Sequence, residues 1–141
     1  MALIGLLALM VMMLPVAGCA GGGGSTTPSE SKGPAEDLTL KIGSVLPQTG
    51  SLAFLGPPEE AGVLLAVNEV NEAKKGLTID FTPGDSGDAD NKAFETTVPK
   101  LQNAGVSAMI GAAASGVTKL FLDSNVAAGI ITFSPANTSP D

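Results

Sequence analysis

The chain has 141 residues with no His, Trp, Tyr or Arg and a single Cys, and its 14 acidic and 7 basic residues give a net charge of −7. Because His is the usual general base near neutral pH and the commonest metal ligand, its absence excludes much catalytic and metal chemistry. The negative charge argues against nucleic acid as a partner, since such binding needs clustered cations. The lone Cys leaves no disulfide framework.

Residues 1–18 predict a lipoprotein signal peptide. The run carries no charged side chain and ends in Pro15 and small residues directly before Cys19, and signal peptides place small residues after an apolar core. The sequence Val-Ala-Gly-Cys resembles a bacterial lipobox, which implies cleavage before Cys19 and lipidation of its thiol. No Lys or Arg precedes the apolar run, so the pattern leaves open an upstream start, and a buried Cys in an apolar helix is the alternative.

Residues 19–37 predict the lipidated Cys19 followed by a flexible tether. Gly, Ser, Thr and Pro dominate the stretch "AGGGGSTTPSESKGP", and such a composition cannot bury apolar area. A lipid, a tether and a folded body beyond it predict an extracytoplasmic protein that is lipid-anchored to the outer face of a bacterial cell membrane.

The folded part opens with a predicted strand and a predicted helix. "LTLKIGSVLP" alternates apolar residues and ends as a strand at Pro47. "PPEEAGVLLAVNEVNEA" begins with two prolines and two carboxylates, which suit a helix N-terminus. Val63, Val67 and Val70 recur at helical spacing, and Gly76 is expected to stop the helix.

Three further strands alternate with two helices. "LTIDF", "VSAMIG" and "IITFSP" predict the strands, and "GVTKLFLDSNVAAG" predicts the last helix. The helix between the first two of these strands carries the apolar stripe Phe94, Val98 and Leu101, with Asp88 or Asp90 expected as its N-cap. Pro99 lies inside this stripe and is expected to kink the helix or to shift its start.

This β-α-β-α-β-α-β order predicts an α/β fold with a parallel open sheet and helices on both faces. In such sheets ligands bind beyond the carboxyl ends of the strands. The loops at 47–57, 84–90, 111–116 and 134–140 all follow predicted strands, so all four are expected at the binding edge.

The loop in "MIGAAASGVTK" holds the strongest candidate site. Gly111 and Gly116 have the spacing of a nucleotide-binding P-loop, but Val117 stands where that motif needs Lys. Ser115 has no adjacent base to activate it as a nucleophile. The remaining hypothesis is that Ser115 and Gly116 open a helix whose free N–H groups bind an anion such as a carboxylate. The alternative is that Ser115 caps its own helix.

Asp85, Asp88 and Asp90 raise the possibility of a calcium site. Their spacing does not match an EF-hand loop, which needs ligands at fixed positions and a closing Glu. A solvated loop is therefore the favoured interpretation, and no metal or cofactor is expected.

Four segments together, "LKIGSVLPQTGSLAFLGPPEEAGVLLAVNEVN", "DSGD", "MIGAAASGVTK" and "ITFSPANTSPD", resemble the leucine/isoleucine/valine-binding family of periplasmic solute-binding proteins. The resemblance covers residues 38–141. It implies two α/β lobes that close on an amino acid or a related small solute and deliver it to an ABC permease, without a cofactor and without chemistry. It also implies that residues 38–141 are a truncated part of the first lobe and that the second lobe is missing.

The resemblance carries ligand contacts to particular residues. It places Ser115 on the α-carboxylate of the ligand, with backbone contacts from Ala113 and Ala114 beside it. It assigns the ammonium end of the ligand to the Ala136 carbonyl and the Thr138 hydroxyl.

Leu55 matches an aromatic residue that lies over the ligand in the family, with Phe54 beside it. This departure leaves the identity of the side-chain pocket open.

The sequence therefore predicts a solute-binding lipoprotein of an ABC transporter that is not an enzyme and binds branched-chain or related small amino acids or amides. Two alternatives stay open: a sensor or regulator of the same fold without transport, and an α/β enzyme whose catalytic half is missing.

Overall fold

The computed structural model describes residues 37–140. The predicted signal peptide, Cys19 and nearly all of the tether lie outside the described residues. The described elements follow the predicted order: β1 (Leu38–Val45), α1 (Gly56–Ala73), β2 (Leu77–Thr82), α2 (Phe94–Asn103), β3 (Ala108–Gly111), α3 (Ser115–Ala127) and β4 (Ile131–Phe133). None of the helices within this range is long and apolar enough to cross a membrane.

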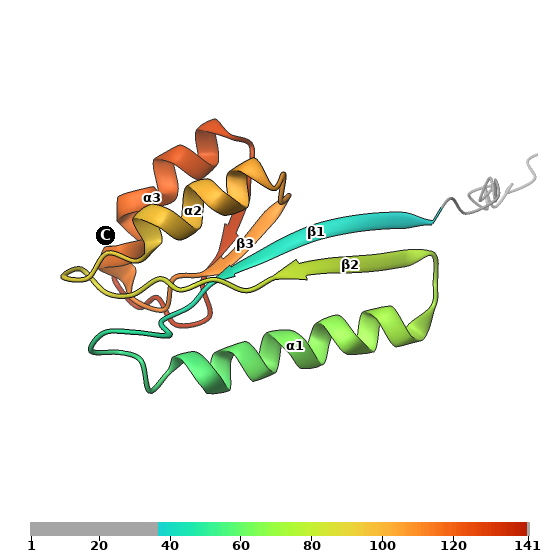
Figure 1. Cartoon of the computed structure of the whole chain (residues 1–141), viewed down its shortest axis with the longest axis horizontal. Coiled ribbons are helices and arrows are strands. Elements are labelled where there is room, and N and C mark those ends of the chain that lie inside the picture. The colour runs from blue at the N-terminus through green and yellow to red at the C-terminus, as the bar shows by residue number, and fades with distance from the viewer. Residues whose placement is uncertain (1–36, 141) are drawn as a thin grey trace, which may run out of the picture. The chain divides into compact units, whose positions relative to one another are not determined.

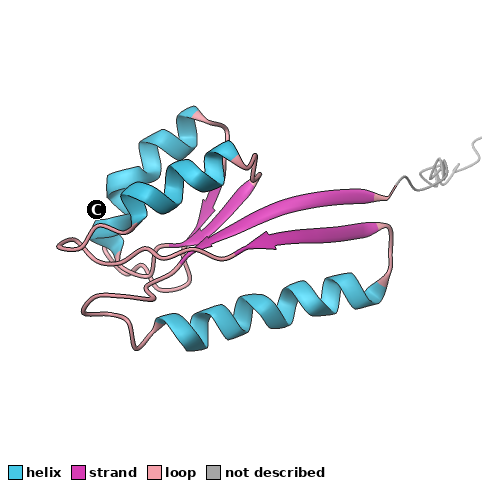
Figure 2. Ribbon diagram, viewed as in Figure 1, coloured by secondary structure: helices cyan, strands magenta, loops and turns pink. Residues whose placement is uncertain are grey.

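The strands form one parallel sheet in the order β2-β1-β3-β4. Helix α1 lies on one face, and α2 and α3 lie on the other (Figure 1). The predicted fold class, a parallel open sheet with helices on both faces, is therefore confirmed. Figure 2 shows the loops that leave the strands gathered at one end of the sheet.

The hydrophobic core lies between the sheet and the α2/α3 pair. The predicted stripe of α2 is fully buried there, and the rings of Phe94 and Phe121 pack with their centroids 6.2 Å apart. Together with Ala112, the core residues are Val45, Phe94, Val98, Leu101, Val106, Met109, Val117, Phe121 and Ile130.

Helix α1 packs less completely on the opposite face. Val67 is buried, whereas Val63 and Val70 of the predicted stripe are half-buried. The helix ends at Ala73, before the predicted stop, because Lys74 already adopts the left-handed conformation with φ 48°. In the last turn of α1, the Asn71 side chain exchanges two hydrogen bonds with the backbone of Ile79 and so ties the helix to the edge strand β2.

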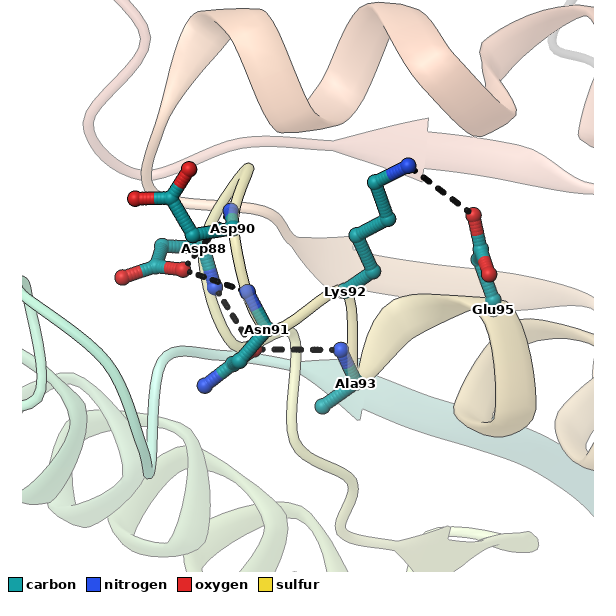
Figure 3. A network of polar contacts seen from close by, with 6 residues as sticks. All are labelled: Asp88, Asp90, Asn91, Lys92, Ala93 and Glu95. Carbon is teal, nitrogen blue, oxygen red and sulfur yellow. Dashed lines mark hydrogen bonds and ion pairs between the residues drawn. The ribbon is translucent and has the colours of Figure 1, made fainter.

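The predicted N-cap of α2 is wrong. The helix begins at Phe94 after Ala93, and no side chain caps it. Asp88 instead accepts hydrogen bonds from the backbone N–H groups of Asp90 and Asn91, each at 3.0 Å, and so closes the turn that precedes the helix (Figure 3). Pro99 lies inside α2; the kink expected there stays a prediction.

Candidate functional site

The four loops that leave the strands meet at the carboxyl edge of the sheet. The central strands β1 and β3 are neighbours, yet β1 leads to α1 on one face and β3 leads to α3 on the other. Adjacent connections that diverge in this way mark a topological switch point, and in open α/β sheets ligands bind beyond the strand ends at such a point.

The β3–α3 loop forms the floor of this edge. Gly111 has φ +128°, and a Cβ there would overlap the Val45 carbonyl, so only glycine allows this close approach. Ala112 and Ala113 are buried, and Ala114, the residue before the helix, is extended with φ −81° and ψ 123°. With such small side chains before it, the backbone at the start of α3 is approachable from the carboxyl edge of the sheet.

Ser115 does not cap its own helix, so that alternative is wrong. It is the first residue of α3, and no side chain supplies a cap. Its Oγ instead accepts hydrogen bonds from the backbone N–H of Thr138 at 3.1 Å and of Ser139 at 3.2 Å. The structure thus brings together two loops that the family resemblance assigns to one ligand.

These contacts fix the chemical character of the Ser115 hydroxyl. A hydroxyl has one proton to donate and two lone pairs to accept. Both lone pairs of Ser115 are engaged by the loop, so only its proton remains for another group. Within residues 37–140, the backbone N–H groups of Ser115 and Gly116 also find no acceptor. The start of α3 therefore presents donors only.

The loop after β4 is folded onto this corner by two hydroxyls that sequence analysis missed. Ser134 Oγ donates to the Ala112 carbonyl at 2.6 Å and accepts from the N–H groups of Ala136 and Asn137. The buried Thr118 Oγ1 accepts from the Ala112 N–H at 3.1 Å and lies 3.3 Å from Asn137 Oδ1. The bonds from Ser134 to Ala136 and Asn137 lie within one loop, whereas the Ser134–Ala112 and Thr118–Asn137 contacts join segments 22 and 19 residues apart, and no local sequence signal marks them.

Leu55 lies on the neighbouring β1–α1 loop. It is half-buried and immediately precedes α1, whereas the adjacent Phe54 is 71% exposed. Among the residues of this loop, Phe54 therefore offers the largest free apolar side chain at the edge.

The β1–α1 loop is bound to the β2–α2 loop through Asp85. Its Oδ1 accepts from the N–H groups of Gln48 at 2.9 Å, Thr49 at 3.2 Å and Gly87 at 2.7 Å, and its Oδ2 accepts from Thr49 Oγ1 at 2.6 Å. Burial raises the pKa of Asp85, but these hydrogen bonds outweigh that effect and hold its pKa below the ordinary value.

Asp88 makes a second link between the same loops. Its Oδ2 accepts from the N–H of Ser51 at 2.7 Å, while Oδ1 closes its own turn. The amides of Asn91, Ser51 and Asp90 lower the pKa of Asp88 to about 2. Within residues 37–140, no group of three or more His, Cys, Asp or Glu side chains is placed to hold a metal ion, and the oxygens of Asp85 and Asp88 are directed at protein donors.

Two carboxylates at the start of α1 are less well paired. Glu60 Oε2 accepts from Ser44 Oγ at 2.9 Å, but Glu60 Oε1 and Glu59 Oε2 are buried without a partner among the described residues. Burial raises the pKa of Glu59.

Comparisons with known proteins match this architecture. The profile of the family described as periplasmic binding protein matches residues 39–141. The leucine-, isoleucine-, valine-, threonine-, and alanine-binding protein of Pseudomonas aeruginosa is 29% identical over 105 residues, which cover 73% of this chain and 28% of the relative.

Solved structures agree with the profile. The branched-chain amino acid transporter substrate-binding protein LivJ from Streptococcus pneumoniae, in complex with isoleucine, superposes with a TM-score of 0.66 at 33% identity over 73% of this chain and 30% of that chain. An ABC transporter substrate-binding protein from Desulfitobacterium hafniense, in complex with leucine, gives a TM-score of 0.60 at 29% identity over 74% of this chain and 30% of that chain. The chain thus spans about 30% of the length of these relatives. Because the family profile matches residues 39–141, well over half of the chain, the chain belongs to the periplasmic binding protein family.

Proposed function

We propose that this chain binds a small amino acid with an apolar side chain, such as leucine, isoleucine or valine, as a solute-binding protein of an ABC transporter, and that it is not an enzyme. The names of the relatives support this solute class.

The partner is then a permease in the membrane, and lipid on Cys19 holds the protein at the outer face. Replacing Cys19 by Ser should abolish the incorporation of labelled fatty acid into the protein, and equal labelling of this variant would contradict the anchor.

The donor-only start of α3 is the observation that carries the proposal. The Ser115 hydroxyl, the Ser115 N–H and the Gly116 N–H form one set of donors at a helix N-terminus, where the backbone dipole favours negative charge. The α-carboxylate of an amino acid is the group that such a set suits best. The small side chains of Ala113 and Ala114 allow it to approach.

The loop after β4 offers the complementary acceptors. Within residues 37–140, the Ala136 carbonyl and the Thr138 hydroxyl have no hydrogen-bond partner. Acceptors beside an anion site suit the α-ammonium group that every amino acid carries next to its carboxylate. Leu55 lies on the β1–α1 loop, at the same end of the sheet, and is the proposed contact for the apolar side chain of the solute.

Replacing Ser115 by Ala tests the carboxylate contact. Because a hydrogen bond to a charged group is lost, leucine should bind about 10- to 100-fold more weakly to this variant in an NMR titration of the full chain. The matched control is Ser107→Ala, since Ser107 is exposed at the opposite edge of the sheet, before β3. Equal affinities in the two variants would contradict the proposed role of Ser115.

A further inference from the structure

We propose that Asp85, with Asp88, is a positioning residue that holds the β1–α1 loop against the β2–α2 loop and so sets where Leu55 lies at the binding edge. The loop in question runs over residues 48–55. The consequence for binding rests on the proposed function, whereas the effect on the loop itself does not.

The loop has few other attachments. Within the described chain, its hydrogen bonds to residues outside itself and α1 all run to Asp85, Asp88 or Asn91. Its internal bonds, from Ala53 N–H to the Gly50 carbonyl and from Leu55 N–H to the Leu52 carbonyl, only shape its second half. The first half is therefore held from outside, by the carboxylates of Asp85 and Asp88 and the amide of Asn91.

The Thr49 hydroxyl bonds to two residues of the other loop. It donates to Asp85 Oδ2 at 2.6 Å and accepts from Asn91 Nδ2 at 2.9 Å, so it connects the two loops in both directions. The backbone conformation at Gly50 fits the same contact. Gly50 has φ +89°, and a Cβ there would collide with the Asp88 carboxylate.

A carboxylate is the group that this position requires. Both oxygens of Asp85 face donors only. If Asn replaces Asp85, either orientation of its amide places an NH₂ group against a donor. A loop held in one conformation before the ligand arrives also saves the ordering cost of binding.

Hydrogen exchange of the full chain tests the proposal, with Asp85→Asn compared with Asp90→Asn. The Asp90 carboxylate lies in the same loop but accepts no hydrogen bond within residues 37–140, and Figure 3 shows it directed away from the other labelled residues. In Asp85→Asn, the N–H groups of Gln48 and Thr49 should exchange about tenfold faster or more, with Met109 and Ile110 of β3 unchanged. Unchanged rates at the loop, or equal acceleration throughout the chain, would overturn the proposal.

A second pair of variants decides the matter if Asp85→Asn does not fold. Thr49→Val removes the hydroxyl that joins the two loops and keeps the side-chain volume nearly constant, whereas Thr49→Ser keeps the hydroxyl. The valine variant should exchange faster at residues 48–51 and the serine variant should not, whereas equal rates would overturn the proposal.

Leucine titrations of the Thr49 variants test the consequence for binding. The valine variant should bind leucine about tenfold more weakly than the serine variant. Equal affinities for a solute that the unaltered chain does bind would refute the positioning role. If the unaltered chain binds no leucine, the proposed function fails and the exchange result stands by itself.

Discussion

The two faces of the sheet are built differently. On the α2/α3 face, ten residues form a continuous buried core, and even the buried amide of Asn125 is satisfied, by Gln102 Nε2 at 3.0 Å and Thr132 Oγ1 at 2.9 Å. On the α1 face, Val67 is the one fully buried apolar side chain that the helix contributes. The same face holds two buried carboxylate oxygens that have no partner among residues 37–140, and Leu64 and Leu65 are exposed.

This contrast shows where the stability of the described part resides. Burial of apolar area is the main favourable term in folding, and here that burial is concentrated between the sheet and the α2/α3 pair. Helix α1 is held to β2 by the paired Asn71 side chain and by a partly buried stripe. Substitutions that are chemically identical should therefore have unequal effects on the two faces.

The largest difference is expected for leucine truncation. Leu101 in α2 is 1% exposed, whereas Leu65 in α1 is 60% exposed. Leu101→Ala should lower the free energy of unfolding by about 2–5 kcal/mol, because it removes buried area and leaves a cavity. Leu65→Ala should change it by less than about 0.5 kcal/mol.

Chemical denaturation of both variants measures this difference. Comparable losses of stability would mean that α1 is covered as completely as α2, and the contrast between the faces would be wrong.

A smaller effect of opposite sign on the two faces is expected when a methyl group is added to a glycine. A Cβ at Gly43 in β1 would lie 2.7 Å from Leu101 Cδ1, whereas a Cβ at Gly62 in α1 would have no described atom within 4 Å apart from its own helix backbone. Gly43→Ala should destabilise the chain by about 1–3 kcal/mol through overpacking. Gly62→Ala should stabilise it by about 0.5–1 kcal/mol, because alanine favours the helix interior.

Melting temperatures suffice to check these signs. A stabilised Gly43→Ala variant would show that the core between the sheet and α2 has room for a methyl group. A destabilised Gly62→Ala variant would show that other atoms pack against α1 at Gly62.

The elements of the fold could be predicted because they depend on local patterns. Alternation in 38–46 and helical spacing of Phe94, Val98 and Leu101 gave the correct strand and the correct buried stripe. The errors lie at the ends of helices, where local chemistry allows several outcomes. Asp88 lies where an N-cap residue would be expected, but its carboxylate accepts hydrogen bonds from the backbone of its own turn and of Ser51 instead of from the helix.

The candidate site was predicted in part. The small-residue loop after β3 predicted a helix start at Ser115 and Gly116, and α3 does begin at Ser115; anion binding there stays a proposal. The partners of Ser115 could not be foreseen, because Thr138 and Ser139 lie 23 and 24 residues away and meet it only through the parallel order of β3 and β4. The link from Asp85 to Thr49 spans 36 residues and is hidden for the same reason.

The most direct test of the central claim is a titration of the ¹⁵N-labelled full chain with leucine and, separately, with leucinol, which lacks the carboxylate. The donor-only corner predicts that leucine shifts the backbone N–H signals of Ser115 and Gly116 and that leucinol leaves them in place. If leucine leaves both signals unmoved, or if leucinol moves them equally, the start of α3 does not bind the negative group of the solute.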